Sequence, residues 1–446
     1  MMPARPFDLM VLGAGAAGML CALLAARRGL SVALVDPHYS QPNNLFISGG
    51  LFPAAGSSLQ RAAGIIDSPE NWLDDLRAFA GDSVNQRIAP AIADALPRLT
   101  DYLASTLKAP IHFLADVPGP GHRVARFHSL EPASGRALHG WLRQAVASES
   151  RIDCVIDRSI DAIERQRGSY VLQVAGQALE APRLMLAGGG FGGNPAMVAQ
   201  YIPEMRGAQN SGTAHNDGSV IALALGWGAT LAGMEGYQGQ GHTNPGATTR
   251  LGMSLPTLGA VMVNRAGRRF VREDIGPSAL AARVLAQPGQ VALDLFDAHI
   301  EAQLGNHSAY VDARAAGKII EADTLDALSA AAGIPADAIK HTLEQVAAYA
   351  RGATDPLGRS GFARVLAPPY RASWVTGSLA HTQGGLVTDA CGRVLNRRGD
   401  TIAGLFAAGG SAAGLSGKGG DGYLPGNGLA QSFGLAWLAL AAINAP

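Results

Sequence analysis

The sequence predicts an α/β protein of more than one domain, and three observations support this fold class. A strand–turn–helix–strand unit opens the chain, in FDLMVLGAGAAGMLCALLAARRGLSVALVDPH at residues 7–38. Alanine-rich sequence with helical spacing fills residues 277–352, between strand-like segments. The chain has 446 residues, which is more than one hydrophobic core usually supports.

The N-terminal unit follows residue by residue from its pattern. A short apolar strand is expected over residues 7–12, followed by GAGAAG, a G-x-G-x-x-G turn, at residues 13–18. Helix formers with small apolar residues occupy residues 19–28, and Gly29 ends that helix. A second strand covers residues 31–35 and ends at Asp36.

This unit predicts a dinucleotide site. Gly13 permits the tight turn, Gly15 lets a pyrophosphate approach the backbone, and Gly18 lets helix and strand pack closely. The helix N-terminus presents free N–H groups to the phosphates, and Asp36 is placed to bind ribose hydroxyls. The alternative is an ordinary glycine-rich turn between strand and helix. The fingerprint alone does not distinguish FAD from NAD.

Composition excludes several function classes. The formal net charge is zero, which gives no electrostatic argument for nucleic acid or an anionic membrane as partner. The three cysteines stand far apart without a CxxC or CxxH motif, which argues against a metal site and a disulfide framework and fits a reducing cytosol. No signal peptide is expected, and the longest apolar stretch, GLAWLALAAINA, is too short to span a membrane. We therefore expect a cytoplasmic protein without an integral membrane segment.

Several further motifs follow the fingerprint in order along the chain. They are SGG at residues 48–50, LMLAGGGFGGNPAMVAQYIPEM, NDGSVIALALGWGA, GAVMVNRAGRRFVRED, HTQGGLVTD, GLFAAGG and GYLPGNGLA. Together they resemble the motifs of the fumarate reductase/succinate dehydrogenase flavoprotein superfamily, and they cover nearly the whole chain. The resemblance implies a Rossmann-like FAD-binding domain, split in sequence into residues 1–236 and 371–446. An α+β capping domain, residues 237–370, is inserted between the two parts.

The resemblance also implies FAD as the cofactor. Succinate dehydrogenases attach the flavin through a histidine, and the matching stretch here, Asn43-Asn44-Leu45, has none, so non-covalent FAD is expected. The expected FAD-binding residues are Gly13, Gly15, Ala16, Ala17, Gly18, Asp36, Pro37, Ser48, Gly49, Gly50, Ala187, Gly188, Gly189, Asn216, Asp217, Gly410, Gly426, Asn427, Leu429 and Ala430.

Enzymes that this chain resembles add or remove two hydrogens across a carbon–carbon bond beside a carbonyl or carboxylate. Flavin N5 exchanges the hydride, a side chain handles the proton, and another group steadies the oxygen. The arginine acid of soluble fumarate reductases maps near Pro277, and its relay maps near Met253 and Pro256. Their substrate-carboxylate arginine is replaced by Tyr423. These losses argue against fumarate as the substrate, because a phenol cannot replace a two-pronged carboxylate clamp.

Three side chains are the catalytic candidates. Tyr423, in GYLPGNGLA, resembles a tyrosine that acts near the substrate ketone in 3-ketosteroid dehydrogenases; the alternative is that it only packs on the flavin edge. His381 matches a histidine that binds substrate oxygen in fumarate reductases, and His242 lies where the superfamily has an HPT-like loop. Either imidazole can donate a hydrogen bond to a carbonyl or carboxylate, and a structural role is the alternative for both. Three further histidines, His122, His128 and His139, have no motif context and are expected on the surface or in loops.

The resemblance favours a ketosteroid-like or smaller cyclic ketone as substrate, with C–C desaturation or ene reduction as the reaction. One alternative is a tricarballylate-type carboxylate dehydrogenase, in which an arginine supplies the carboxylate contact, with Arg250, Arg268, Arg269 and Arg272 as candidates. Another is a non-catalytic flavoprotein subunit that passes electrons to a partner. No haem motif or iron–sulfur cysteine cluster occurs, so a separate electron acceptor or donor is expected.

Overall fold

The computed structural model describes residues 5–117, 119–166, 168–252, 254–305, 307–359, 361–362 and 364–443. The chain forms two compact units. The first comprises Met1–Met197, Gly212–Tyr237 and His381–Pro446, and the second Val198–Ser211 and Gln238–Ala380. Assignment of the functional domains to residues 1–236 with 371–446 and to residues 237–370 remains a prediction.

A six-stranded sheet forms the centre of the first unit. Its order is β20–β21–β11–β2–β3–β7, and all neighbouring pairs are parallel except β20 with β21. The strands are β2 (Leu9–Leu12), β3 (Val32–Asp36), β7 (Ile152–Ile156), β11 (Leu184–Leu186), β20 (Arg393–Leu395) and β21 (Thr401–Ala407). Strand β2 reads LMVL and is buried at every position, as expected for a parallel strand covered on both faces.

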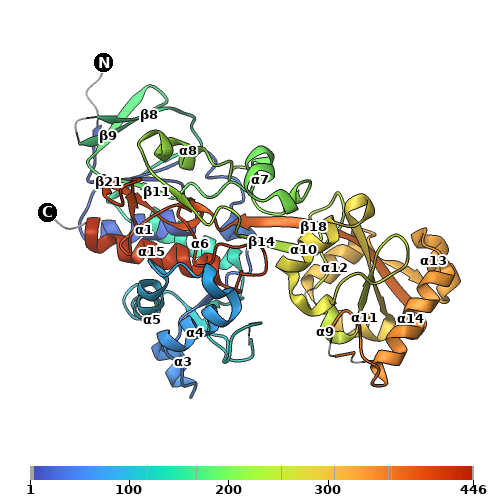
Figure 1. The fold of residues 1–446 in the computed structure, drawn as a ribbon. Helices are drawn as coiled ribbons and strands as arrows, with labels where there is room; N and C mark the ends of the chain where they lie inside the picture. The colour runs from blue at the N-terminus through green and yellow to red at the C-terminus, as the bar shows by residue number, and fades with distance from the viewer. Residues whose placement is uncertain are drawn as a thin grey trace. The chain divides into compact units, whose positions relative to one another are not determined.

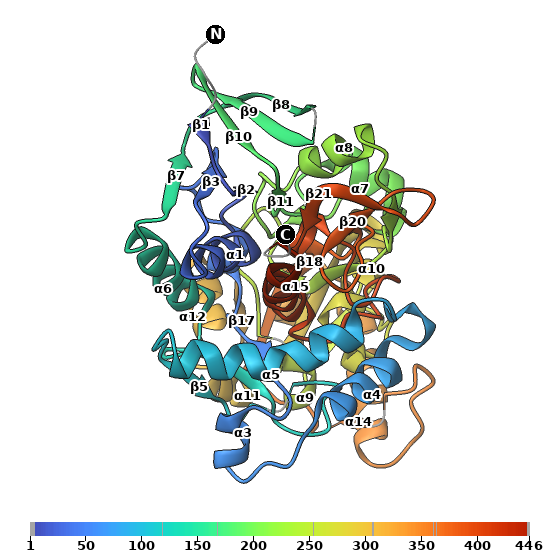
Figure 2. The same ribbon diagram turned by 90° about the vertical axis from the view of Figure 1, so that its left-hand side faces the viewer.

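Two helices that are far apart in sequence pack side by side in this unit. Helix α1 (Ala16–Arg27) is buried from Ala16 to Ala26 and contacts α15 (Asn427–Ile443) (Figure 1). Helix α5 (Ala89–Ser105) contacts α15 as well (Figure 2). The terminal apolar stretch is therefore a buried helix of the core. In the part of the chain that the structure describes, no helix is long and apolar enough to cross a membrane.

Smaller elements complete the first unit. Strands β1 (Arg5–Pro6), β8 (Ile160–Gln166), β9 (Ser169–Val174) and β10 (Gln177–Ala181) form one sheet; β4 (Phe52–Pro53), β5 (Ile111–Phe113) and β6 (Phe127–Leu130) form another; β13 (Leu231–Ala232) pairs with β19 (Gly385–Leu386). The other helices are α2 (Asn44–Ile47), α3 (Ser58–Ala62), α4 (Pro69–Ala80), α6 (Gly135–Ala147) and α8 (Ser219–Gly226). Helix α7 (Pro195–Tyr201) begins in the first unit and ends in the second.

The second unit is built on a sheet centred on β18 (Tyr370–Thr382), whose last two residues belong to the first unit. Its other strands are β12 (Gln209–Asn210), β14 (Tyr237–Thr243), β15 (Val261–Val263), β16 (Val291–Asp297) and β17 (Ile320–Ala322), and its helices are α9 (Leu255–Leu258), α10 (Pro277–Leu285), α11 (Ala298–Leu304), α12 (Ser308–Ala315), α13 (Leu325–Ala332) and α14 (Ala336–Ala350). Strands β12, β14, β16 and β17 all pair with β18, and β15 pairs with β16.

The local elements agree closely with their sequence patterns. The first strand, helix and second strand are present, and α1 begins at Ala16, earlier than the expected residues 19–28. The alanine-rich stretch forms α10 to α14 with β16 and β17 between them. Asp337 lies in the first turn of α14 instead of forming its N-cap, because the helix starts directly after Pro335. Gly352, with φ of +107°, follows the end of that helix as expected.

Candidate active site and cofactor-binding residues

The turn after β2 is a tight glycine turn with one open face. Gly13 has φ of +104°, and a Cβ placed there would lie 2.4 Å from the Ala187 carbonyl oxygen. A Cβ on Gly18 would lie 1.8 Å from the Gly13 oxygen, so neither glycine can carry a side chain. A Cβ on Gly15, by contrast, would meet nothing within 4 Å. The turn is therefore closed against β11 on one side and leaves space at Gly15.

Helix α1 begins at that open glycine. Gly15 is its N-cap and supplies no side-chain cap, and the first turn contains Ala16 and Ala17 without an acidic residue. Its first N–H groups therefore depend on a partner from outside the helix, which suits a phosphate. Asp36, at the end of β3, accepts hydrogen bonds from the backbone of Ala14 at 2.7 Å and of His38 at 2.7 Å, across Pro37. The carboxylate thus borders the same turn.

The other predicted cofactor segments of the first unit form close backbone contacts. Gly50 has φ of +71°, and a Cβ there would lie 2.4 Å from the Ser134 carbonyl carbon; its N–H donates to Ser48 Oγ at 3.1 Å, and Gly49 lies between them. A Cβ on Gly188 would meet the Val220 side chain, and one on Gly189 would meet Asn216 Oδ1. A Cβ on Gly410 would meet the backbone nitrogen of Gly190. Asp217 accepts from Ser219 N at 2.9 Å at the start of α8. The structure thus brings residues 187–189, 216–217 and 410 together.

The N-terminus of α15 contains an unsatisfied buried group. Asn427, the first residue of the helix, is fully buried; its Nδ2 donates to Ser416 Oγ at 3.3 Å, and its Oδ1 has no partner. Gly426 has φ of +90°, and Leu429 and Ala430 continue the first turn. An orphaned buried oxygen requires a donor, because leaving it unpaired costs about 1–3 kcal/mol. An isoalloxazine ring supplies such a donor, so this site fits FAD.

In the loop before Gly50, the stretch Asn43-Asn44-Leu45 contains no histidine, and its two amides are hydrogen-bonded. Asn43 caps α2 through Oδ1, which accepts from Phe46 N at 3.1 Å, and its Nδ2 donates to the Ala14 oxygen at 3.2 Å. Asn44 Oδ1 accepts from Thr213 N at 2.7 Å. The two amides organise the backbone around the turn, and Leu45 beside them is buried.

Tyr423 lies at the N-terminus of α15, next to a backbone donor. Its side chain is buried, and its oxygen lies close to Gly428, where an added Cβ would be 3.6 Å away. Burial raises the pKa of the phenol above its usual value, and the nearby backbone N–H of Gly428 opposes that shift only in part. Tyr423 is therefore a neutral phenol at pH 7, and its O–H is available to donate.

His381, the penultimate residue of β18, contacts Tyr423. The two rings meet edge to face, with centroids 5.3 Å apart and an interplanar angle of 78°. Gln383 Nε2 lies 2.8 Å from His381 Nε2, and Gln383 Oε1 has no partner. Burial lowers the pKa of His381 to about 4, so the imidazole is neutral at pH 7. Tyr423, His381 and Gln383 therefore form a neutral polar cluster.

Gly428 leaves room for this cluster. A Cβ on Gly428 would lie 3.0 Å from His381 Nε2, 3.1 Å from its Cε1 and 3.6 Å from the Tyr423 oxygen. The first turn of α15 therefore approaches both rings as bare backbone.

His242 belongs to the second unit and has a partner that the sequence did not indicate. Its Nδ1 lies 2.7 Å from Asp294 Oδ2, and both residues are buried. The residues lie on different strands, β14 and β16. Asp294 stands in VALDLFD, where no motif marks it, so only the strand arrangement could reveal the pair.

The expectation of a surface or loop position was wrong for His128 and His139, which are buried in β6 and α6; His122 lies in the loop between β5 and β6, as expected, but is buried there. His122 Nε2 lies 3.0 Å from the Pro425 oxygen, and His128 Nε2 lies 2.8 Å from Ser57 Oγ. Burial lowers the pKa of both His122 and His128 to about 4. Their burial depends on contacts with residues far away in the sequence, so local composition did not indicate it.

The candidate arginines differ in whether a carboxylate of the protein forms an ion pair with their guanidinium. Arg269 pairs with Glu273 at 2.8 Å and Asp355 at 3.0 Å, and Arg272 pairs with Asp274 at 2.7 Å. Arg250 and Arg268 have no ion-pair partner among the described residues. Pro277 opens α10, Pro256 lies in α9, and Met253 lies outside the described residues.

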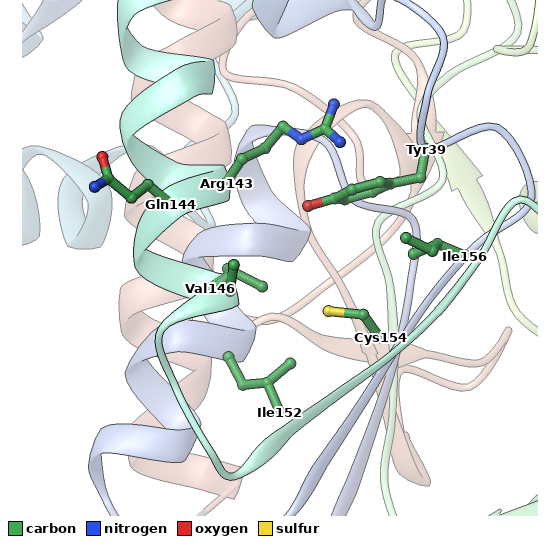
Figure 3. A pocket seen from close by; sticks show the side chains of 8 residues that line it. Tyr39, Arg143, Gln144, Val146, Ile152, Cys154 and Ile156 are labelled. Atoms are coloured by element: carbon green, nitrogen blue, oxygen red, sulfur yellow. The ribbon is translucent and has the colours of Figure 1, made fainter.

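A pocket of about 510 Å³ lies between α6 and β7 (Figure 3). The Arg143 guanidinium lies over the Tyr39 ring, 4.1 Å from its centroid, and Cys154 lines the same pocket. Burial raises the pKa of Tyr39 and of Cys154. The predicted cofactor and catalytic residues do not line this pocket.

The sequence and fold match known flavoproteins. Residues 8–429 match the family described as "FAD binding domain". A probable fumarate reductase, Ifc3, of Shewanella frigidimarina is 29% identical over 430 residues, covering 93% of this chain and 71% of the relative. A 3-oxosteroid 1-dehydrogenase of Mycobacterium tuberculosis is 26% identical over 540 residues, covering 93% and 94%. The open conformation of a flavocytochrome c3 fumarate reductase superimposes with a TM-score of 0.85 at 25% identity, over 99% of this chain and 78% of that structure.

Proposed function

The chain belongs to the FAD binding domain family, and from that premise we propose that it desaturates, or reduces, a carbon–carbon bond beside a ketone. It is an FAD-dependent oxidoreductase acting on CH–CH groups. FAD, when bound, accepts or supplies the hydride at N5. The residues proposed to hold it are the glycine turn with Asp36, the segments 48–50, 187–189 and 216–217, Gly410 and the first turn of α15.

One observation supports the choice of a ketone: the Tyr423 hydroxyl lies beside Gly428 in the first turn of α15, where an added Cβ would be 3.6 Å from the phenol oxygen. An O–H donor beside a backbone N–H donor suits one carbonyl oxygen, whose charge grows as the neighbouring C–H bond ionises. The positive end of the helix dipole favours the same charge. A carboxylate, with two oxygens and a full charge, instead requires a cationic clamp, and the described side chains of this cluster are neutral.

In this proposal Tyr423 polarises the carbonyl oxygen. Its raised pKa keeps the proton on the phenol, so it donates to the oxygen and does not remove a proton from carbon. His381 packs edge to face against the phenol ring and fixes its orientation. Because the imidazole is neutral at pH 7, it adds no charge to the site. We also propose that the substrate is either a ketosteroid-like ketone or a smaller cyclic ketone.

The first test is anaerobic bleaching of the flavin band by a panel of cyclic ketones, steroid ketones, dicarboxylates and tricarboxylates. We expect ketones to reduce the oxidised enzyme, or their enone counterparts to reoxidise the reduced enzyme. Tyr423→Phe removes the hydroxyl and keeps the ring, and we expect it to lower kcat/KM about 100-fold, as loss of one oxyanion donor does. Full turnover by Tyr423→Phe with every accepted substrate would refute the assigned role.

A carboxylate dehydrogenase is the second candidate, because Arg250 is exposed and has no ion-pair partner among the described residues. A cation without a counter-ion can bind an anionic ligand. In that case tricarboxylates would bleach the flavin and Arg250→Gln would abolish the reaction. Arg272→Gln is the matched control, since Arg272 is already paired with Asp274.

The proposal includes a separate electron acceptor or donor and a cytoplasmic location. Cys21, Cys154 and Cys391 are free thiols, which supports a reducing compartment. The third hypothesis is a flavin subunit that only passes electrons to a partner. Bleaching of the flavin by a substrate in the isolated protein would argue against it.

A further inference from the structure

The segment that carries Tyr423, residues 420–426, is held by few hydrogen bonds. Its backbone bonds are local, such as the one from Tyr423 N to the Gly420 oxygen at 3.3 Å. Among the described residues, one hydrogen bond ties this segment to a distant part of the chain: His122 Nε2 lies 3.0 Å from the Pro425 oxygen. The conformation of a segment with so few bonds depends on that single long-range contact.

The two neighbours of His122 fix where its proton lies. A carbonyl oxygen only accepts hydrogen bonds, so Nε2 carries the proton and donates to Pro425. On the other side of the ring, Nδ1 lies 3.4 Å from a guanidinium nitrogen of Arg126, which only donates. A neutral imidazole with its proton on Nε2 satisfies both neighbours. Burial lowers the pKa of His122 to about 4, so this neutral form is present at pH 7.

Arg126 is itself anchored by two buried carboxylates. Its side chain is fully buried and forms ion pairs with Asp67 at 3.0 Å and with Asp75 at 2.8 Å. Asp75 also accepts a hydrogen bond from the backbone N–H of Arg123 at 3.0 Å. Removing these charges from water is costly, and such a cluster suits a role in fixing one arrangement better than a role in stability alone. The arrangement fixed here includes the guanidinium nitrogen that faces His122.

The residues on either side of Pro425 pack against the same stretch of the chain. A Cβ on Gly121 would lie 2.8 Å from Leu424 Cδ1, and Leu424 is fully buried. A Cβ on Gly426 would lie 2.8 Å from Phe127 Cε1. The backbone before and after the Pro425 carbonyl therefore lies against the stretch of the first unit that supplies its hydrogen-bond donor.

We propose that His122 is a positioning residue for Tyr423 and acts through the Pro425 carbonyl; this rests on the proposed function. The contacts run from Arg126 to His122, then to Pro425, two positions after Tyr423. Without the bond from His122 the segment keeps only its local hydrogen bonds, and the phenol oxygen shifts. Because displacement of a reacting group by about 1 Å can cost about 100-fold in rate, His122 affects kcat without touching the substrate.

The first test compares His122→Phe with His122→Gln in the holoenzyme, with the ketone that bleaches the flavin fastest. Phenylalanine keeps an aromatic ring at this buried position and removes the donor, whereas a glutamine amide can still donate to the Pro425 oxygen. We expect His122→Phe to lower kcat at least about 10-fold, the value of one lost hydrogen bond, and to leave KM within about twofold. His122→Gln should recover most of kcat.

A second readout does not require turnover. Fluorine NMR of holoenzyme labelled with fluorotyrosine reports the surroundings of each tyrosine, and Tyr423→Phe identifies the Tyr423 resonance by its absence. We expect His122→Phe to shift or broaden this resonance and His122→Gln to restore it. Histidine ¹⁵N NMR of the wild type should show His122 protonated at Nε2 and unprotonated at Nδ1 at pH 7. This last measurement tests the hydrogen bond even if His122→Phe fails to fold.

His128→Phe is the matched control. His128 is also a buried histidine of the first unit, but its hydrogen bonds go to Ser57 and to the Arg126 carbonyl oxygen. Loss of these bonds should lower Tm, while the Tyr423 resonance stays in place and kcat stays within about twofold of the wild type, the range of substitutions outside the reacting groups. This separates a general loss of stability from a displaced phenol.

Two results would overturn the inference while the proposed function stood. One is a wild-type Tyr423 resonance and kcat in His122→Phe, and the other is a wild-type His122 protonated at Nδ1 instead of Nε2. If no ketone bleached the flavin of the wild type, the proposed function would fail. The Tyr423 resonance in His122→Phe would then still support or overturn the positioning of the segment.

Discussion

The imidazole of His381 meets the ring of Tyr423 edge to face, at 5.3 Å between centroids, and both rings lie against the bare backbone of Gly428. This contact joins the end of β18 to the first turn of α15, segments more than 40 residues apart in sequence. The glycines of GYLPGNGLA thus serve close approach and are not a flexible linker. The cluster is polar but uncharged at pH 7, because burial lowers the pKa of His381 to about 4 and raises the pKa of Tyr423.

Gly428→Ala should damage this cluster without damaging the fold. The new Cβ would lie 3.0 Å from His381 Nε2, so the imidazole must shift by a few tenths of an ångström. Helix α15 itself should tolerate alanine, which is the better helix former. We expect kcat to fall at least about 10-fold, since small displacements at a reacting centre are costly, while FAD content and Tm stay unchanged. Gly140→Ala is the control, because a Cβ on Gly140 would meet nothing within 4 Å. Gly434→Ala is a poorer control, since its Cβ would lie 2.7 Å from the Ile92 side chain.

The two glycines of the first turn should respond differently to alanine. Gly13→Ala must place a Cβ 2.4 Å from a carbonyl oxygen at φ of +104°, so we expect loss of stability in the apoprotein as well as loss of FAD. Gly15→Ala meets no protein atom within 4 Å, so its apoprotein should keep the wild-type Tm while FAD affinity falls at least about 10-fold. Apoprotein Tm and FAD titration measure the two effects separately. Unchanged FAD affinity in Gly15→Ala would argue that the pyrophosphate does not lie there.

The flavin should be released completely by acid precipitation. Asn43 and Asn44 occupy the loop where succinate dehydrogenases attach the flavin through histidine, and both amides are engaged in backbone hydrogen bonds. An amide engaged in this way is not a nucleophile for the isoalloxazine ring. We expect all of the flavin absorbance in the supernatant after protein precipitation, identified as FAD by chromatography. Flavin retained in the pellet would contradict non-covalent binding.

The sequence predicted the parts of the fold that depend on local pattern. The apolar run of β2, the glycines at 13, 15 and 18 and the stop at Gly29 together specify β2, α1 and β3 within about 30 residues. The pairing of His242 with Asp294 depends instead on the arrangement of β14 and β16 around β18. Long-range strand pairing leaves no local periodicity, so a single aspartate in an apolar strand gave no signal.

The burial of polar side chains was the other feature that could not be predicted from the sequence. His128 was expected on the surface because no motif surrounds it, yet it is fully buried between Ser57 and the Arg126 carbonyl. Its partner Ser57 is 71 residues away in the chain. A histidine is neither strongly apolar nor strongly charged, so its burial is decided by tertiary hydrogen bonds that composition does not reveal.

His128 also predicts how stability depends on pH. Burial lowers the pKa of the folded imidazole to about 4, below the value near 6.5 of an unfolded histidine. Below pH 6.5 the unfolded chain binds a proton that the folded chain does not, so stability falls with falling pH until the folded pKa is reached. The full shift corresponds to about 3 kcal/mol.

The measurement compares holoenzyme Tm for wild type and His128→Gln at pH 7, 6, 5 and 4.5. Glutamine can keep hydrogen bonds to Ser57 and the Arg126 oxygen but does not titrate. We therefore expect the variant to gain stability relative to the wild type as the pH falls. Parallel curves for wild type and His128→Gln would show that His128 is not the group that resists protonation in the folded core.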